Sequence, residues 1–394
     1  MNKITIFETF AGIGSQIKAL KNISNKFNLK VESLGFVEWY LDAIISYEII
    51  NNKILKQDKK TNIEDIKKSL SSLKISSDSK NIVSPNYFSK LTEERLRSIY
   101  PYLKKFIKKN TWEREREHLN CYLDINDVNS LPSNIDIFTY SFPCQDISQQ
   151  GKQKGINEQT RSGLLLQVKR ILEINKDNLP AVLLLENVKA LGSKKFTTSL
   201  NEWILFLESL GYVSEYKILN SSDFGSCQNR ERLFMVSILK NKQLRKFDWP
   251  IPFSHNKTLE NIIKLNEDDI FLDKLKDKQI TEFKVTKNNI TKSLILEYTK
   301  FNSENYLYKP FGFGPTLTAS GANSRIKFYF GSVDKVKEIT PLESYLYMGF
   351  SKKDANKVIN SGLINKSKMI FTCGNSISVE VLESLFESII KCIK

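Results

Sequence analysis

The chain has 394 residues, of which 41% are hydrophobic, so it is long enough for a substantial core and for two domains. Charged residues interrupt every apolar run well short of the roughly 18 residues that a membrane-spanning helix needs. The net charge of +15 favours a polyanionic partner such as nucleic acid, although a lysine-rich composition along the whole chain is the simpler alternative.

Cysteine and histidine are scarce and widely spaced. The chain has five cysteines, an odd number with no CxxC pair, which excludes a zinc ribbon and a disulfide framework and indicates a reducing compartment such as the cytoplasm. These are Cys121, Cys144, Cys227, Cys373 and Cys392. The two histidines, His118 and His255, are too few for a multi-histidine metal site.

Apolar strand-like runs alternate with helix-like segments through the first two-thirds of the chain. Strands are expected over residues 3–7, 31–37, 120–125, 135–141 and 180–185, and helices over 16–27, 164–173 and 200–210. Two further strands, near 213–219 and 232–239, are expected to close the sheet as an antiparallel hairpin, and a last helix is expected over 378–393. This alternation predicts an α/β fold with a doubly wound, mostly parallel sheet.

Two regions interrupt the strand and helix alternation. Residues 59–118 form an insertion with 15 Lys and Arg against 8 Asp and Glu, so much of the charge excess is local. Residues 245–331 are polar and predict a smaller second domain. We therefore expect a catalytic domain over 1–244, with 332–370 as a connecting region and 371–394 returning to the catalytic domain.

A glycine turn follows the first predicted strand. The stretch FAGIG, residues 10–14, precedes a predicted helix, where backbone amides can approach a ligand. A dinucleotide fingerprint would need glycine at position 17, where Ile17 stands. The next strand ends in Glu38 and Trp39, a carboxylate suited to ribose hydroxyls and an indole suited to adenine. This favours a nucleoside such as S-adenosylmethionine, the alternative being a surface Glu beside a half-buried Trp.

Cys144 lies in SFPCQDIS, residues 141–148, just past the end of an apolar strand. Zinc deamination is excluded because position 147 is Ile and neither histidine begins a His-x-Glu motif. Glu186 follows another apolar strand, and the carboxyl ends of parallel strands share one crevice, so Cys144 and Glu186 are expected to face the same cleft. The alternatives are a structural loop cysteine for Cys144, a helix cap for Glu186, and an exposed salt-bridge ladder for Arg230 and Arg232.

In chain order, the stretches FAGIG, EW, LDI, PCQ, ENV, QNRER and GNSIS resemble the motif series of the DNA (cytosine-5) methyltransferase family. The resemblance covers nearly the whole chain except residues 59–118 and the region near 245–310. The overall proportions, with the insertion, are most similar to the mollicute enzymes that modify CG sites. The resemblance implies the S-adenosylmethionine-dependent methyltransferase fold with a smaller target-recognition domain.

The resemblance also implies roles for the residues of these motifs. Cys144 would add to C6 of a flipped-out cytosine while Glu186 contacts N3, and Arg232 would contact the base near O2, with Arg230 as its paired candidate. The methyl donor would be S-adenosylmethionine. The residues implied to hold it are Phe10, Gly12, Gly14, Glu38, Trp39, Asp124, Ile125, Pro143, Leu165, Asn375 and Ser376.

The implied partner is double-stranded DNA, bound by an enzyme that acts as a monomer. Residues 146–162 resemble the mobile catalytic loop of the family, and PTLTA, residues 315–319, resembles the Thr-Leu element of its recognition domain. The DNA-contacting candidates are Gln145, Ser148, Lys152, Thr316, Leu317 and Thr318. Related alternatives are an RNA methyltransferase and a catalytically silent DNA-binding protein.

Two features of the sequence depart from the family pattern or lie outside it. Lys337 and Leu342 stand where the family usually has arginines, in an element that organises the recognition domain. The basic insertion is equally compatible with a clamp on the DNA backbone and with a solubilising or stabilising subdomain.

Overall fold

The computed structural model describes residues 2–107, 120–142, 163–266, 269–275, 278–300 and 302–394. Pro143, Cys144, Gln145, Ser148 and Lys152 lie outside these described residues, as do the expected catalytic loop and His118. The chain divides into two compact units. The first comprises residues 1–219, 231–250 and 383–394, and the second comprises residues 220–230 and 251–382.

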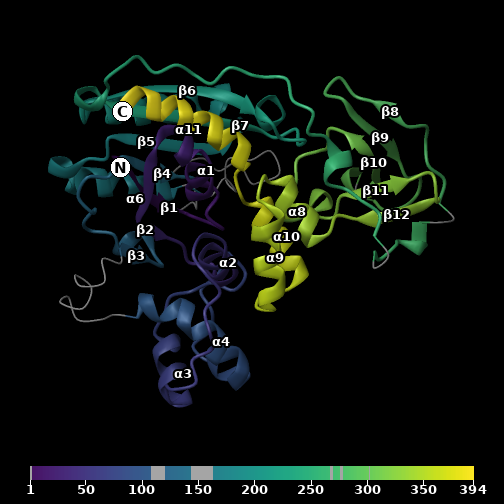
Figure 1. Ribbon diagram of the computed structural model, residues 1–394, viewed down its shortest axis with the longest axis horizontal. Helices are drawn as coiled ribbons and strands as arrows, with labels where there is room; N and C mark the ends of the chain where they lie inside the picture. The colour runs from purple at the N-terminus through teal and green to yellow at the C-terminus, as the bar shows by residue number, and fades with distance from the viewer. Residues whose placement is uncertain (1, 108–119, 143–162, 267–268, 276–277, 301) are drawn as a thin grey trace. The chain divides into compact units, whose positions relative to one another are not determined.

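Among the described residues, a seven-stranded sheet forms the centre of the first unit, in the order β3-β2-β1-β4-β5-β7-β6 (Figure 1). Its strands are β1 (Asn2–Thr9), β2 (Leu29–Val37), β3 (Asn120–Tyr122), β4 (Ile137–Tyr140), β5 (Val182–Val188), β6 (Tyr212–Asn220) and β7 (Glu231–Leu239). β1 pairs in parallel with both β2 and β4, and β5 pairs antiparallel with β7. The predicted doubly wound, mostly parallel sheet is confirmed, and its order reverses between β1 and β4, where such folds bind ligands.

Within the described residues, five helices of the first unit lie outside the basic insertion. They are α1 (Ser15–Ile23), α2 (Leu41–Asn51), α6 (Leu164–Ile174), α7 (Thr197–Ser209) and the part of α11 (Val379–Ile393) from residue 383 onward. The sequence analysis did not predict α2. Ten consecutive residues of α2, 41–50, are buried, so the helix has no polar face and shows no amphipathic period.

The described part of the basic insertion, residues 59–107, forms a small helical subdomain within the first unit. It contains α3 (Ile63–Ser71) and α4 (Glu93–Leu103), and Figure 1 shows the two helices next to each other beside α2. α3 begins at an Asn62 cap and α4 at a Thr92 cap, each accepting a backbone N–H of the first turn. The helices bury an apolar core made of Ile66, Leu70, Phe88, Leu96, Ile99, Tyr102 and Leu103. The insertion is therefore a packed element rather than a loose loop.

The second unit contains a five-stranded sheet, within its described residues, in the order β12-β11-β10-β9-β8. The strands are β8 (Lys284–Val285), β9 (Ile290–Leu294), β10 (Tyr306–Gly312), β11 (Lys327–Phe330) and β12 (Lys335–Glu338). Three helices follow, α8 (Pro341–Tyr347), α9 (Lys352–Ser361) and α10 (Lys366–Gly374). This unit also takes in residues 220–230, which the sequence analysis assigned to the catalytic domain, and residues 371–382.

Lys337 stands where an arginine is usual in the family, and the structure shows how the second unit accommodates the lysine. It lies in β12 with only 1% of its surface exposed, and its Nζ is 2.8 Å from both Asp269 Oδ2 and Glu343 Oε1. The ammonium also donates to the carbonyl oxygen of Lys264 at 2.6 Å. Burial alone would raise the pKa of Asp269, but hydrogen bonds and the charge of Lys337 lower it. A lysine at this position thus carries a fully partnered buried charge.

Candidate functional site

The glycine turn between β1 and α1 has a backbone that favours glycine at two positions. Gly12 has φ +56° and Gly14 has φ +79°. A Cβ at Gly14 would lie 2.3 Å from Asn51 Nδ2 and 2.7 Å from Tyr47 Cδ2, so this glycine allows α1 to pack against α2. A Cβ at Gly12 would meet no described atom within 4 Å. Gly14 is therefore required by packing, whereas Gly12 faces open space at the edge of the sheet where doubly wound folds generally bind ligands.

Glu38 connects the end of β2 to this turn. Its Oε2 accepts a hydrogen bond from the N–H of Gly12 at 2.8 Å, and its Oε1 accepts from the N–H groups of Trp39 at 2.9 Å and Tyr40 at 2.8 Å. Desolvation by burial raises the pKa of Glu38, and the three backbone donors act in the opposite direction. The structure therefore brings two of the predicted cofactor residues, Gly12 and Glu38, into direct contact.

Asp124 follows β3, the next strand across the sheet. The N–H of Glu38 donates to the carbonyl oxygen of Tyr122 at 3.0 Å, which holds the ends of β2 and β3 together. Asp124 is partly exposed and caps a short 3-10 helix through the N–H of Asn126 at 2.9 Å. The remaining described cofactor candidates of the first unit are Phe10 and Trp39, both partly exposed, and Ile125 and Leu165, both buried in one hydrophobic cluster.

Glu186 and Arg232 form an ion pair at the edge where β5 ends and β7 begins. The sequence analysis expected Glu186 to follow the strand. β5 continues to Val188, so Glu186 lies within the strand instead. The Nε of Arg232 is 3.2 Å from Glu186 Oε1, and the two side chains are 17% and 12% exposed. A largely buried, paired carboxylate and guanidinium are thus placed at the same edge of the sheet as Glu38.

Asn187, to which the sequence analysis assigned no role, is a candidate positioning residue at the end of β5. Its side chain is 2% exposed, and its Nδ2 donates to the carbonyl oxygen of Phe142 at 3.1 Å. Phe142 follows β4 and lies two positions before Cys144 in the chain. Asn187 therefore fixes the backbone that leads to the cysteine. The available signal was its place in the ENV stretch beside Glu186.

Glu8 is a second residue that the sequence analysis missed. It lies in β1, fully buried, where Oε2 accepts from the hydroxyl of Tyr47 at 2.6 Å and Oε1 from the N–H of Ile17 at 3.2 Å. Burial raises its pKa from 4.5 to about 7, against the opposing effect of these donors. Glu8 connects β1, α1 and α2 directly behind the glycine turn, and the signal was a carboxylate within the apolar stretch ITIFETF.

In the second unit, Arg230 joins three of the motif stretches. Its side chain is 3% exposed, and its guanidinium donates to the carbonyl oxygens of Leu317 at 2.8 Å, Gly374 at 3.2 Å and Ser376 at 2.7 Å. A Cβ at Gly374 would lie 2.2 Å from the backbone of Thr318, so this glycine allows the close approach. These contacts favour a positioning role for Arg230 over the contact with the base that the resemblance implies.

The Thr-Leu element is held by the same stretch that contains Arg230. Gln228 Oε1 accepts from the N–H of Leu317 at 2.9 Å, and the hydroxyl of Thr316 donates to the carbonyl oxygen of Asn229 at 2.6 Å. Leu317 is fully buried, so we expect it to anchor the element, whereas Thr316 and Thr318 are partly exposed. Of the cofactor candidates in this unit, Ser376 is buried and Asn375, which ends α10, is exposed.

A doubly wound sheet with a glycine turn after β1 and acidic residues after β2 and β3 is typical of α/β folds that bind a nucleoside cofactor, a class that includes the α/β methyltransferases. The comparisons with known proteins give the family. The family model described as C-5 cytosine-specific DNA methylase matches residues 99–391. The chain belongs to this family, and its activity is that of a DNA cytosine-5 methyltransferase.

Two curated relatives match the chain over nearly its full length. It is 43% identical over 394 residues to the orphan methyltransferase M.SssI of the mollicute Spiroplasma monobiae, covering 98% of this chain and 97% of the relative. It is 33% identical over 401 residues to the type II methyltransferase M2.ScrFI of Lactococcus lactis subsp. cremoris, covering 98% and 99%. The resemblance stated from the motifs is confirmed at the level of the family.

Solved structures agree with the fold. The crystal structure of the Schizosaccharomyces pombe Dnmt2 methyltransferase matches with a TM-score of 0.57 at 16% identity, over 98% of each chain. The Entamoeba histolytica methyltransferase EhMeth matches with a TM-score of 0.55 at 16% identity, over 99% of each chain. Within the described residues, no helix is both long and apolar enough to cross a membrane.

Proposed function

We propose that the protein transfers a methyl group from S-adenosylmethionine to C5 of a flipped-out cytosine in duplex DNA, at a short site such as CG. The observation that carries this proposal is the Glu186–Arg232 ion pair, which lies beside the Asn187 tether to the chain leading to Cys144. The CG target rests on the resemblance to the mollicute enzymes and on the 43% identity to M.SssI.

The glycine turn and the acids beside it suit S-adenosylmethionine. Gly12 leaves open space where a ligand can approach the backbone, and Glu38 at the adjacent strand end offers a carboxylate for ribose hydroxyls. Asp124 supplies a second acceptor after β3, suited to an adenine amino group, and the partly exposed Trp39 offers a ring face. When bound there, the sulfonium supplies the methyl group. Asn375 and Ser376 remain candidates for this site.

Cytosine C5 is a weak nucleophile, and the proposed chemistry increases the electron density at C5. The thiolate of Cys144 adds to C6 while Glu186, in its protonated form, donates a proton or hydrogen bond to N3, and Arg232 contacts O2. C5 then attacks the methyl carbon, and S-adenosylhomocysteine leaves. N3 returns any proton it received to Glu186, and loss of the C5 proton to a base expels the thiolate and restores the aromatic ring. A cytosine inside the duplex hides C5 and C6, so the base must leave the stack first.

The second unit is proposed to recognise the target sequence. Arg230 and Gln228 hold the Thr-Leu element through its backbone, which leaves the partly exposed Thr316 and Thr318 as candidates for DNA contact. We expect the enzyme to act as a monomer on double-stranded DNA. In this scheme Arg230 positions the recognition element. Arg232, two positions further along the same stretch, contacts the base.

Bisulfite sequencing of DNA from cells that express the protein tests activity, base and target together. We expect unconverted cytosines at one short site such as CG, and no unconverted sites with Cys144→Ser. Retained methylation in that variant would disprove the covalent role of Cys144. A side-by-side assay of labelled methyl transfer to duplex DNA and to tRNA separates the substrates, and transfer to tRNA alone would replace DNA by RNA in the proposal.

A further inference from the structure

A hollow of about 910 Å³ opens on the helical subdomain, between the loop after α2 and the C-terminal end of α4. Its lining includes Lys56, Lys59 and Lys60 from the loop and Lys104 from the end of α4, together with the single carboxylate Asp58. We call these residues the lysine hollow. All four lysines are exposed, and none lies within ion-pair distance of a carboxylate among the described residues.

The acidic groups near the lysine hollow already have other partners. Asp58 Oδ1 accepts the N–H groups of Thr61 at 2.8 Å and Lys60 at 3.0 Å, and these bonds, led by that of Thr61, lower the pKa of Asp58. Glu93 pairs with Arg97 at 2.7 Å, and Glu48 pairs with Lys105. The charge of Lys104 also contributes to lowering the pKa of Asp58, but the two groups form no ion pair, so the ammonium groups of the hollow are available to an external anion.

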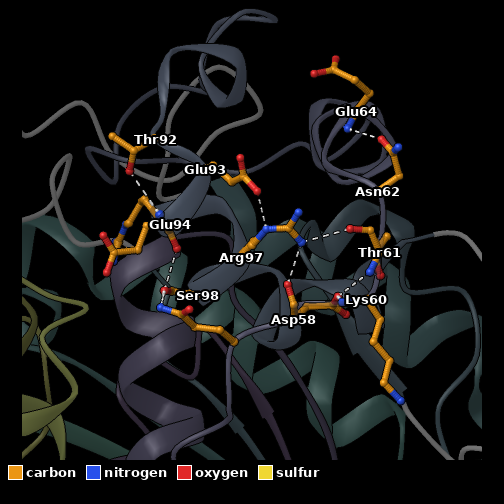
Figure 2. A network of polar contacts seen from close by, with 12 residues as sticks. Asp58, Lys60, Thr61, Asn62, Glu64, Thr92, Glu93, Glu94, Arg97 and Ser98 are labelled. Atoms are coloured by element: carbon orange, nitrogen blue, oxygen red, sulfur yellow. Dashed lines mark hydrogen bonds and ion pairs between the residues drawn. The ribbon is translucent and has the colours of Figure 1, made fainter.

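The loop that presents three of the lysines is firmly held by Arg97 of α4 (Figure 2). The guanidinium donates from Nη1 to the carbonyl oxygens of Asp58 at 3.0 Å and Thr61 at 3.1 Å, and from Nε to Glu93 at 2.7 Å. The N–H of Asp58 in turn donates to the carbonyl oxygen of Arg97 at 3.0 Å. Four residues on, Pro101 has no N–H for that carbonyl, so the proline leaves an acceptor inside α4 for the loop.

Two further hydrogen bonds attach the same loop to α4. The N–H of Leu55 donates to the hydroxyl of Tyr102 at 2.9 Å, and Gln57 Nε2 donates to the hydroxyl of Ser98 at 2.9 Å. The backbone from residue 55 to residue 61 is thus fixed at several points along α4. Because this order already exists in the protein, a ligand of the hollow need not order the loop on binding.

We propose that the lysine hollow binds the phosphate backbone of the substrate DNA outside the base pairs at which methyl transfer occurs. Lysine ammonium groups are compact point charges that suit phosphates and carry little base selectivity, so the contact adds affinity without changing the target sequence. The exposed, open shape suits a continuous polyanion better than a small phosphate ester. The inference rests on the proposed function only in taking duplex DNA as the partner.

The test compares two triple variants with the same change in charge. Lys56→Gln/Lys59→Gln/Lys104→Gln alters the hollow, and Lys68→Gln/Lys74→Gln/Lys90→Gln alters exposed lysines of the same subdomain outside it. The dissociation constant for a duplex is measured by fluorescence anisotropy over a series of salt concentrations. For the hollow variant we expect binding at least about tenfold weaker and a log–log salt slope smaller by about 2 to 3, since each phosphate contact contributes about 0.9. The control should keep a slope close to that of the unaltered protein.

Equal slopes for the two variants would overturn the proposal. A third variant, Lys56→Arg/Lys59→Arg/Lys104→Arg, should retain tight binding, which shows that the loss in the Gln variant is one of charge and not of folding. Lysine acetylation of the unaltered protein gives an independent readout. Duplex DNA should protect Lys56, Lys59 and Lys104 and leave Lys68 and Lys74 reactive, and uniform reactivity would also overturn the proposal.

These binding measurements do not depend on methyl transfer. The proposed function and the proposed DNA contact of the lysine hollow can therefore be contradicted independently of each other. Salt-dependent protection of the hollow in a protein that transfers no methyl group to DNA would contradict the proposed function alone. Methyl transfer with an unprotected hollow and equal slopes would contradict the inference alone. Protection by a single-stranded RNA but not by duplex DNA would replace the proposed partner.

Discussion

The Nε of Arg232 lies 3.2 Å from Oε1 of Glu186, across the antiparallel pair of β7 and β5. The strand register places Arg232 opposite Val188, two residues beyond Glu186, so the long arginine side chain reaches back along the strand to the carboxylate. Each side chain thereby orients the other, in the region where the proposed mechanism places N3 and O2 of the cytosine.

Glu186→Gln should reduce turnover far more than cofactor binding. Glutamine keeps the shape of the side chain but cannot donate an acidic proton and removes the charge that orients Arg232. We expect kcat for labelled methyl transfer to fall by about 10²- to 10³-fold. S-adenosylmethionine affinity, measured by calorimetry, should change little because Glu186 is not among its candidate residues, most of which lie after β1, β2 and β3. Full turnover in this variant would contradict the role of Glu186.

Asn187→Ala should lower both stability and turnover. The substitution removes the hydrogen bond to Phe142 and leaves a buried carbonyl oxygen without that partner, at a cost of about 1 to 3 kcal/mol in the free energy of unfolding. Asn178→Ala is the matched control, because its Nδ2 also donates to backbone carbonyls, at 3.1 Å, before β5 begins. If Asn187 positions the chain before Cys144, only Asn187→Ala should slow covalent trapping on a duplex that contains 5-fluorocytosine. Equal trapping rates would leave Asn187 with a purely structural role.

The sequence predicted the sheet well because alternating and apolar runs mark its strands directly. It did not predict α2, whose burial on all sides removes the helical period. It ended β5 before Glu186, since the extension to Val188 depends on pairing with β7, a tertiary contact. The contact between Asn187 and Phe142 likewise depends on the register that places Tyr140 beside Leu185. Motif order therefore indicated the candidate residues, whereas the partners that hold them required the three-dimensional pairing.

Lys337→Met should strongly destabilise the second unit. The substitution leaves the largely buried carboxylates of Asp269 and Glu343 without their shared cation, which typically costs about 3 to 5 kcal/mol. Lys337→Arg retains the charge and introduces the arginine that is usual in the family, and should cost less. Chemical denaturation followed by far-UV circular dichroism, with limited proteolysis of the second unit, measures the difference. Equal stability of the Met and Arg variants would show that the charge is unimportant.

Gly12→Ala and Gly14→Ala should separate ligand binding from packing. Both positions have positive φ, which costs about 1 kcal/mol for alanine. At Gly14 the added methyl also overlaps Tyr47 and Asn51, so this variant should lose about 2 kcal/mol or more. At Gly12 the methyl enters open space, so the protein should stay folded while its affinity for S-adenosylmethionine falls at least about tenfold. Unchanged affinity in Gly12→Ala would place the cofactor elsewhere.

Glu8 should make stability depend on pH near neutrality. Its pKa is about 7 in the folded protein against an ordinary value of 4.5, so the protonated carboxyl stabilises the fold fully below pH 4.5. This contribution is lost as the pH rises through about 7. Glu8→Gln is neutral at every pH. The unfolding free energy of the unaltered protein should therefore fall relative to that of the variant by on the order of 3 kcal/mol between pH 4.5 and pH 8.

Denaturant titrations at a series of pH values measure this difference for Glu8→Gln. Glu32→Gln is the control, because Glu32 is partly exposed on β2 and pairs with the exposed Lys3 at 3.3 Å, a contact with little effect on stability. The Glu32 variant should follow the unaltered protein at each pH. If the Glu8 variant also followed it, the carboxyl of Glu8 would titrate in its ordinary range, and its burial against Tyr47 would not control the stability of the glycine turn.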